Sequence, residues 1–192
     1  MKMRTQNEAT AQKLLPTRWE TARLSVEDSR QEDVPELQMA LDSCDYIKPW
    51  TGGEGWSMQN SLDGGDLPPN GSKEFFRLQS IRSKETGQLV GFLDLYHGYP
   101  TADVFWVGLL VIQPQFQKAG YGREVMGGLK EILKGLGSYR AIGLGVALKN
   151  WPALRFWTRL GFDRITAIKG DAIHSENTFA FMQIGMTEEQ VA

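Results

Sequence analysis

The chain of 192 residues has a single cysteine, Cys44, and only two histidines. One thiol forms no intramolecular disulfide and cannot build a cysteine-based metal cluster, so we expect a reducing, cytoplasmic location and read Cys44 as a bystander. His97 and His174 lack the spacing of a metal site, and no metal is expected.

Long apolar runs are absent as well. No segment approaches the roughly 20 apolar residues of a membrane span, and the N-terminus lacks the apolar core of a signal peptide. Basic and acidic residues nearly balance, at 21 against 23, so net charge indicates neither a nucleic acid nor a membrane as partner. Hydrophobic residues at 41% are typical of a globular protein that builds a core. We expect one domain over residues 21–185, between a flexible lead (1–20) and a tail (186–192).

Apolar periodicity predicts the elements. Strands are expected over residues 23–27, 75–82, 88–96, 102–112, 140–148, 162–169 and 178–184. Helices are expected over residues 31–41, 56–62 and 150–160, with another that follows Gly122 and ends near Gly135 and Gly137. The later alternation of strands and helices predicts an α/β fold, with a mixed central sheet and helices on both faces.

Residues 42–72 are rich in Gly, Asp, Pro and Asn, yet they contain Trp50, Trp56 and Met58. A linker would lack these large side chains, so the segment is either a lid on the substrate side or a surface excursion that packs on the domain. The acidic residues beside the tryptophans could receive a cationic amine: Asp42, Asp45, Glu54, Asp63 and Asp66.

Two glycines stand where a buried strand gives way to an amphipathic helix, in the segment QPQFQKAGYGREVM (residues 113–126). The first N–H groups of a helix have no intrahelical partner and lie at the positive end of its dipole. A phosphate or pyrophosphate could approach the backbone at Gly120 and Gly122, with Lys118 and Arg123 adding charge. The P-loop pattern occurs nowhere, and Val125 stands where a dinucleotide loop needs its third glycine. A tight turn that only starts a helix is the alternative.

The glycine turn belongs to the longer pattern L-x-I-x-P-x-F-Q-x-x-G-x-G, from Leu110 to Gly122. It is followed by N-W-P-A-L-R-F-W-T-R-L-G-F, from Asn150 to Phe162. In order and spacing, the two segments resemble the motifs of the GNAT superfamily of acyl-CoA-dependent N-acyltransferases. The resemblance implies the GNAT fold, with acetyl-CoA (CoA) as the cofactor.

By this resemblance, the backbone of Leu110 and Ile112 would pair with the pantetheine arm, and the amides from Gln117 to Arg123 would hold the pyrophosphate. Asn150 either contacts the cofactor or caps its helix, and Phe156 either lines the cofactor or packs in the core. The implied cofactor-binding residues are Leu110, Val111, Ile112, Gln117, Lys118, Ala119, Gly120, Tyr121, Gly122, Arg123, Asn150, Ala153, Phe156 and Trp157.

The chain departs from the family pattern at two places. Many members carry a tyrosine proposed to protonate the departing thiolate, where this chain has Trp157, whose indole is no usable acid. Members often have a carboxylate on the strand before the glycine turn, where this chain has Trp106 and Gly108.

The missing carboxylate matters because an alkyl amine, with a pKa near ~10.4, is almost fully protonated at pH 7, so a base must take its proton. The candidate bases are Asp94, His97 and Asp103. His97 has a suitable unperturbed pKa, although its place beside Gly98 in a turn is typical of a surface histidine.

We therefore expect an N-acetyltransferase that moves an acetyl group from acetyl-CoA to a primary amine of a small molecule or peptide. The amine would attack directly in a ternary complex, and backbone N–H groups near Leu110 would stabilise the oxyanion. Polyamines, aminoglycosides, amino acids and protein N-termini all fit as acceptors. A non-catalytic acyl-CoA-binding module is the alternative, and the failed fingerprints disfavour a nucleotide-binding enzyme of another fold. A homodimer through a sheet edge is compatible with the pattern.

Overall fold

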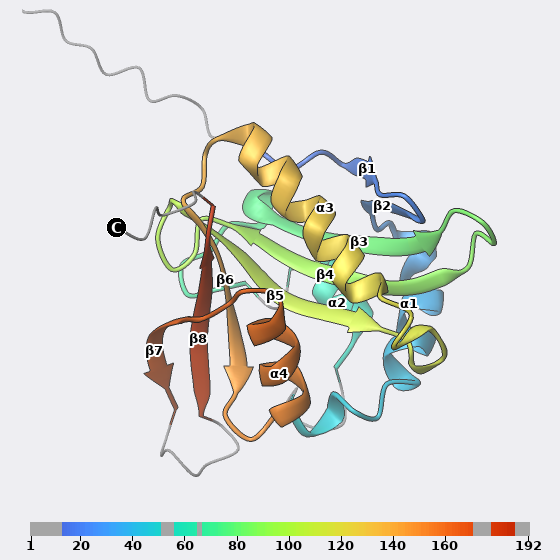
Figure 1. Cartoon of the computed structure of the whole chain (residues 1–192). Helices are drawn as coiled ribbons and strands as arrows, with labels where there is room; N and C mark the ends of the chain where they lie inside the picture. Colours follow the sequence, from blue (N-terminus) through green and yellow to red (C-terminus); the bar gives the residue numbers. More distant parts are fainter. Residues whose placement is uncertain (1–12, 51–55, 65–66, 171–177, 187–192) are drawn as a thin grey trace, which may run out of the picture.

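A single mixed sheet organises the protein (Figure 1). The structure, a computed structural model, describes residues 13–50, 56–64, 67–170 and 178–186. Within these ranges the strand order is β1-β2-β3-β4-β5-β6-β8-β7. Only β5 and β6 pair in parallel there, and the other neighbours are antiparallel. The strands are β1 (Arg18–Glu20), β2 (Leu24–Asp28), β3 (Phe76–Ser83), β4 (Leu89–His97), β5 (Val104–Ile112), β6 (Ala141–Ala147), β7 (Arg164–Lys169) and β8 (Phe179–Gly185).

Helices cover both faces of the sheet, as the sequence predicts (Figure 1). On one face lie α3 (Tyr121–Leu136) and α4 (Trp151–Arg159), and on the other lie α1 (Val34–Asp42) and α2 (Met58–Leu62). Each face has its own cluster of buried hydrophobic residues. Across the described ranges, none of the helices has the length and apolar character that crossing a membrane requires.

The longest helix, α3, follows directly from its periodicity. Val125, Leu129 and Leu133 recur every four residues, and all three are fully buried against the sheet. Burying each such side chain contributes about 1.5–3 kcal/mol. Gly137 ends the helix in the left-handed conformation, with φ 67°. Gly135, the other predicted terminator, lies inside the helix.

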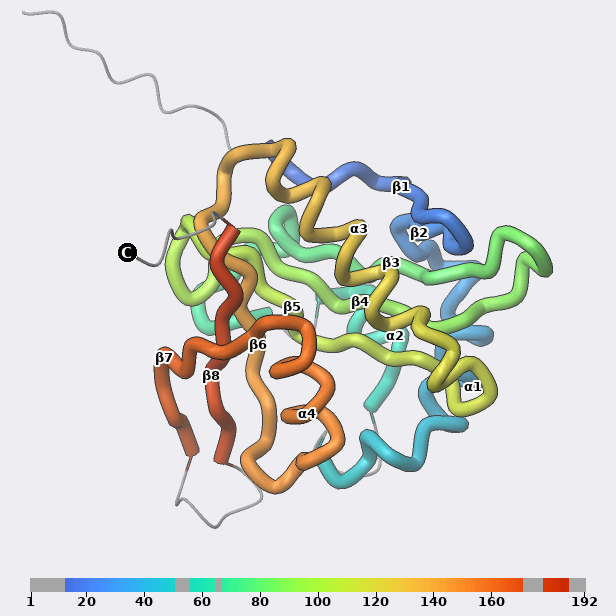
Figure 2. Tube along the Cα trace, viewed as in Figure 1, coloured from blue at the N-terminus to red at the C-terminus, as the bar shows by residue number. Residues whose placement is uncertain are grey.

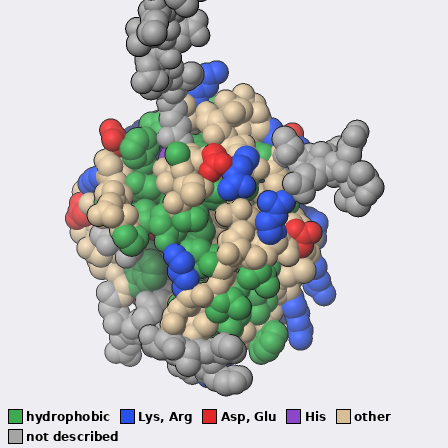
Figure 3. All heavy atoms as spheres, turned by 90° about the vertical axis from the view of Figure 1, so that its left-hand side faces the viewer, with side chains coloured by type: hydrophobic (Ala, Val, Ile, Leu, Met, Phe, Trp, Pro, Cys, Tyr) green, Lys and Arg blue, Asp and Glu red, His purple; other side chains and the backbone are tan. Residues whose placement is uncertain are grey.

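The central strand β4 is buried on both faces, whereas side chains of the edge strand β7 are exposed. Every residue of β4 is buried, as the side chains of a strand covered on two sides should be. On β7, Ile165 and Ile168 are 58% and 55% exposed. Figure 3 looks onto this side of the molecule and shows hydrophobic side chains gathered on it. The sheet therefore has one edge whose backbone and apolar side chains are accessible.

The first strand lies inside the segment for which a flexible lead was predicted. Trp19 of β1 is buried, and its indole Nε1 donates a hydrogen bond to Gln79 Oε1 at 2.9 Å. Leu15 is buried as well. Trp19 and Leu15 stand among polar residues, so the sequence shows no apolar periodicity here. Their hydrogen bonds to Gln79 of β3 and His97 of β4 show that the stretch packs on the sheet. Residues 1–12 lie outside the described ranges.

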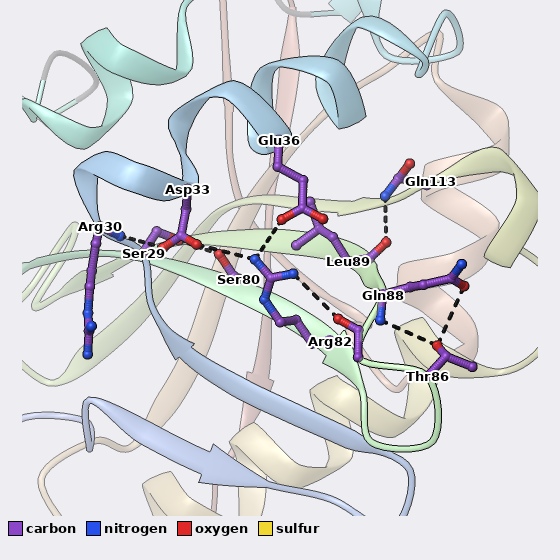
Figure 4. Close-up of polar contacts among 11 residues, drawn as sticks. Ser29, Arg30, Asp33, Glu36, Ser80, Arg82, Thr86, Gln88, Leu89 and Gln113 are labelled. Atoms are coloured by element: carbon purple, nitrogen blue, oxygen red, sulfur yellow. Dashed lines mark hydrogen bonds and ion pairs between the residues drawn. The ribbon is translucent and has the colours of Figure 1, made fainter.

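Parts of the 42–72 segment pack on the domain, as its aromatic content predicts. Met58 is fully buried, and Trp56 packs on the cluster beneath α1 and α2. Arg82 of β3 links the start of α1 to the sheet, because its guanidinium donates hydrogen bonds to Asp33 and Glu36 (Figure 4). Residues 51–55 and 65–66, which include two of the predicted acidic residues, lie outside the described ranges.

Candidate functional site

The parallel strands β5 and β6 separate halfway along their length. They pair from Val104 with Ala141 to Val107 with Leu144, and the pairing ends there. Figure 2 shows the two strands starting together and diverging toward the other end. Gly108, the first residue of β5 beyond the pairing, is exposed. The divergence therefore opens the middle of the sheet at this residue.

The free edge of β5 presents backbone groups to this opening. Gln113 directs its N–H to Val90 of β4 at 2.9 Å, and its side chain donates to Leu89 O (Figure 4). Because backbone groups alternate direction along a strand, Ile112 and Leu110 turn theirs away from β4, toward the opening. Val111 turns its backbone back toward β4, and its side chain is fully buried. Leu110 and Ile112 thus direct their backbone groups away from β4, whereas Val111 directs its own toward β4; their contact with a cofactor stays a prediction.

The glycine turn has the geometry of an anion site. Lys118 and Gly120 both adopt left-handed conformations, with φ of 62° and 86°, and α3 begins at Tyr121. In the described part of the chain, the structure records no hydrogen-bond acceptor for the backbone N–H groups from Lys118 to Arg123. Consecutive free N–H groups at a helix N-terminus form a concave site for a phosphate group.

The two glycines of the turn have different roles. Gly120 adopts the left-handed conformation that a side chain disfavours. At Gly122, an added Cβ would lie 3.1 Å from Cζ of Phe156, so this glycine makes room for the Phe156 ring. That both glycines keep the backbone clear for a phosphate stays a prediction, and at Gly122 contact with the Phe156 ring is a second reason for the missing side chain.

Two side chains already satisfy the backbone of Ile112. Tyr46 donates from its hydroxyl to Ile112 O at 3.0 Å and accepts from Ile112 N at 3.3 Å. Burial raises the pKa of Tyr46 to about 12, so the hydroxyl keeps its proton. Gln117 also donates to Ile112 O, at 3.0 Å, through its side-chain amide. Gln117 therefore closes the turn onto β5, and Tyr46 holds the groups that the family resemblance assigns to the pantetheine arm.

The predicted residues of α4 divide between capping and packing. Asn150 caps the helix, because its Oδ1 accepts a hydrogen bond from Ala153 N at 3.2 Å. Phe156 and Ala153 are partly buried and pack against the cluster under α3 and α4. Trp157 is buried between Phe156 and Phe162, with ring centroids 4.9 and 5.2 Å away. The indole of Trp157 is thus part of the core.

Two of the three candidate bases are poorly placed. His97 is only 2% exposed, packs edge-on against Phe105, accepts from Leu15 N and bonds to the Tyr139 hydroxyl. It is therefore a core residue, not the surface histidine that its turn suggests. Burial, with a smaller effect of Arg77, lowers its pKa to about 4.

Asp103 forms an exposed ion pair with Arg140 at the start of β5. At about 3.3 Å per residue, Asp103 is about 16 Å along the strand from Gly108, too far for direct proton transfer at the opening.

Asp94 is the candidate that reaches the opening. The register of β4 and β5 shifts beside Asp94, which leaves Gly108 as the extra residue of a bulge. A Cβ added at Gly108 would lie only 2.6 Å from Asp94 Oδ1. The carboxylate of β4 thus fills the space of a side chain at position 108, and it is 6% exposed. The sequence predicts Asp94 as one of three candidate bases, and only the strand register shows that its carboxylate lies beside Gly108 of β5.

Comparison with known proteins identifies the family. Residues 39–162 match the family described as "Acetyltransferase (GNAT) family", which is more than half of the chain. The chain belongs to the GNAT acetyltransferase family. No curated protein sequence matches it.

Solved GNAT-family acetyltransferases have the same fold. One from Bacillus anthracis has 17% sequence identity and a TM-score of 0.68, covering 88% of this chain and 98% of that one. Spermidine N-acetyltransferase from Vibrio cholerae, in complex with CoA and spermine, has 15% identity and a TM-score of 0.64, covering 85% and 95%. The ribosomal-protein-S18-alanine N-acetyltransferase from Escherichia coli has 16% identity and a TM-score of 0.58, covering 88% and 99%. The mixed α/β GNAT fold predicted from the two motifs is confirmed.

On this GNAT fold, Trp106 and Tyr99 pack on the sheet face under α1 and α2. Trp106 contacts Tyr99 and Phe181, with ring centroids 4.9 and 5.0 Å away. An added Cβ at Gly143 would lie 3.1 Å from the Trp106 ring, so the Gly143–Gly145 stretch is a packing feature.

In the described ranges, no group of three or more His, Cys, Asp or Glu residues could hold a metal ion.

Proposed function

We propose that the protein is an N-acetyltransferase that transfers an acetyl group from acetyl-CoA to a primary amine by direct attack in a ternary complex. The observation that carries the proposal is the combination of free N–H groups at the head of α3 with the opening between β5 and β6. Family membership supplies the reaction class.

The chain's own residues suit the donor. The amides from Lys118 to Arg123 would bind the phosphates, and Lys118 and Arg123 are exposed beside them. Leu110 directs its N–H into the opening, where it can stabilise an oxyanion. Acetyl-CoA, when bound, supplies the acetyl thioester. A thiol with a pKa of about 8.5 leaves readily as thiolate, so the core position of Trp157 need not prevent reaction.

The acceptor amine would approach from the side of Asp94, whose carboxylate can take its proton directly or through a water molecule. Two of the structural neighbours are named for amine acceptors, spermidine and a ribosomal-protein alanine. The predicted acidic surface for a cationic amine is weakened, because Asp45 is paired with Lys48 and Asp63 accepts from Gln59. Small amines and peptide N-termini remain the acceptors to test.

Calorimetry with CoA tests the donor site. Glu at position 120 would set a carboxylate beside the phosphates, and two like charges about 5 Å apart repel by about 3 kcal/mol at an effective dielectric of 20. We expect Gly120→Glu to lose on the order of 100-fold in CoA affinity. Gly137→Glu is the matched control: Gly137 has φ 67° at the other end of α3, with nothing within 4 Å of an added Cβ. Equal CoA affinity in the two variants would contradict the assignment.

An amine panel separates enzyme from binding module. The wild type is incubated with acetyl-CoA and polyamines, amino acids, aminoglycosides or peptides, and CoA release is measured. Turnover on any of them supports the transferase. Tight CoA binding with no turnover on the whole panel would instead favour the non-catalytic module, for which the lost tyrosine is the motivating observation.

A further inference from the structure

Arg23, in the connection between β1 and β2, reaches across to the glycine turn. Its two terminal nitrogens each donate to the carbonyl oxygen of Ala119 at 3.1 Å. Its Nε donates to Glu124 Oε2 at 2.6 Å, and its guanidinium carbon lies 4.4 Å from the ring centroid of Tyr121. One side chain thus contacts the turn, the first turn of α3 and the aromatic residue between them.

The contact with Ala119 fixes the direction of the next amide. In a trans peptide, the carbonyl and the following N–H point in opposite directions. The Ala119–Gly120 bond is trans, because among the described residues only Tyr99–Pro100 is cis. Holding the carbonyl of Ala119 toward Arg23 therefore aims the N–H of Gly120 the other way.

The contact with Glu124 removes an obstacle to anion binding. Glu124 lies in the first turn of α3, where an unpaired carboxylate would compete with a bound phosphate for the helix N-terminus. Its Oε1 accepts from the Thr21 hydroxyl at 2.6 Å and from the Arg23 backbone N–H at 2.8 Å, and its Oε2 accepts from the Arg23 guanidinium. Every one of these donors comes from the β1–β2 connection. The negative charge of Glu124 is thereby balanced by Arg23, and its carboxylate is fixed against the β1–β2 connection.

From this geometry we infer that Arg23 is a positioning residue of the phosphate-binding turn. It orients the Gly120 amide and neutralises Glu124, so that a phosphate at the head of α3 meets N–H groups without a competing carboxylate. The inference rests on the proposed function, since it assumes that the turn binds the diphosphate of CoA. Nothing in the local sequence indicates this role, because Arg23 and Ala119 are 96 residues apart.

The test compares two acetyl donors, acetyl-CoA and a shorter thioester. Arg23→Ala and Arg23→Lys are measured by calorimetry with CoA and by kinetics with acetyl-CoA and with S-acetyl-pantetheine, which lacks the diphosphate. We expect Arg23→Ala to weaken CoA binding and to raise KM for acetyl-CoA by about 10- to 100-fold, the value of hydrogen bonds to a charged group. The kcat with acetyl-CoA and the kcat/KM with S-acetyl-pantetheine should stay within about twofold, because positioning of the turn matters only for the phosphates.

Arg23→Lys and two further variants test the separate contacts of Arg23. Arg23→Lys keeps the charge but cannot make the paired contacts, so its CoA affinity should fall between wild type and Arg23→Ala. Adding Glu124→Gln to Arg23→Ala should recover part of the lost affinity, because the carboxylate is then gone. Arg18→Ala is the matched control from the same hairpin, where Arg18 makes an exposed pair with Glu20, and it should bind CoA as wild type does.

Each outcome has a separate meaning. Unchanged CoA affinity in both Arg23 variants, while wild type binds CoA, would overturn the inference and leave the proposed function intact. Equal loss on both donors would also overturn it, because a general structural role predicts that result. Wild type that fails to bind CoA would overturn the proposed function itself. If Arg23→Ala does not fold, the comparison of Arg23→Lys with wild type decides the question.

Discussion

Two substitutions test whether Asp94 is the base: Asp94→Ala removes the carboxylate of β4, and Gly108→Asp in the same chain adds a carboxylate on β5. At pH 7 only about one in ~2500 molecules of an alkyl amine with a pKa near 10.4 is neutral, a cost of roughly 4.6 kcal/mol. A positioned base contributes about 10²- to 10⁴-fold to the rate. We therefore expect Asp94→Ala to lower kcat by about that factor, with CoA affinity unchanged.

The distance between Gly108 and Asp94 predicts the catalytic rates of two further variants. An added Cβ at Gly108 would lie 2.6 Å from Asp94 Oδ1, whereas ordinary contact begins at 3.4 Å, so Gly108→Ala must displace the carboxylate by about 0.8 Å. A displacement near 1 Å can cost about 10²-fold in rate. In the Asp94→Ala background, Gly108→Asp would place a carboxylate in the vacated space. We expect this double variant to regain at least about tenfold in kcat over Asp94→Ala.

The assay is CoA release at saturating acetyl-CoA and amine, followed from pH 6 to 10. Asp103→Ala is the control, because this aspartate is exposed and paired with Arg140 at the far end of β5, and its kcat should match wild type. Wild-type kcat in Asp94→Ala would refute the assignment. An Asp103→Ala variant as impaired as Asp94→Ala would show that the distance argument is wrong.

Three other predictions concern binding and stability. Tyr46→Phe should tighten CoA binding by about fivefold, because the cofactor no longer has to displace a hydroxyl worth about 1 kcal/mol from Ile112; calorimetry measures this, and weaker binding would show that Tyr46 contacts the cofactor. His97 has a folded pKa of about 4 against ~6.5 unfolded, so its contribution is complete above pH 6.5 and is lost as the pH falls toward 4. Urea unfolding should show the wild type losing about 3 kcal/mol more than His97→Asn over that interval, and parallel losses would contradict the buried neutral histidine. Gly122→Ala should destabilise the fold by about 1–3 kcal/mol through its clash with Phe156, and Phe156→Leu should relieve it; thermal melts that show no such rescue would contradict the packing role.

Much of the fold could be predicted because its signals are local. The spacing of Val125, Leu129 and Leu133 predicts α3, and the apolar run before Pro114 predicts the central strand β5. The short strand at Trp19 could not be predicted, because two isolated apolar residues carry no periodicity. The buried indole of Trp19 has its hydrogen-bond partner, Gln79, 60 residues away.

Some features of the candidate site likewise follow from local sequence, and others follow from tertiary contacts. The sequence by itself determined the glycine turn and the two family motifs, because the left-handed conformation that glycine allows and the unpaired amides at the start of a helix are local features. Only the tertiary structure decided that Asp94 fills the space beside Gly108, that Tyr46 covers Ile112 and that Arg23 holds Ala119. These contacts join segments that meet only after the sheet has formed, and strand register and side-chain reach, which no local pattern encodes, fix which groups touch.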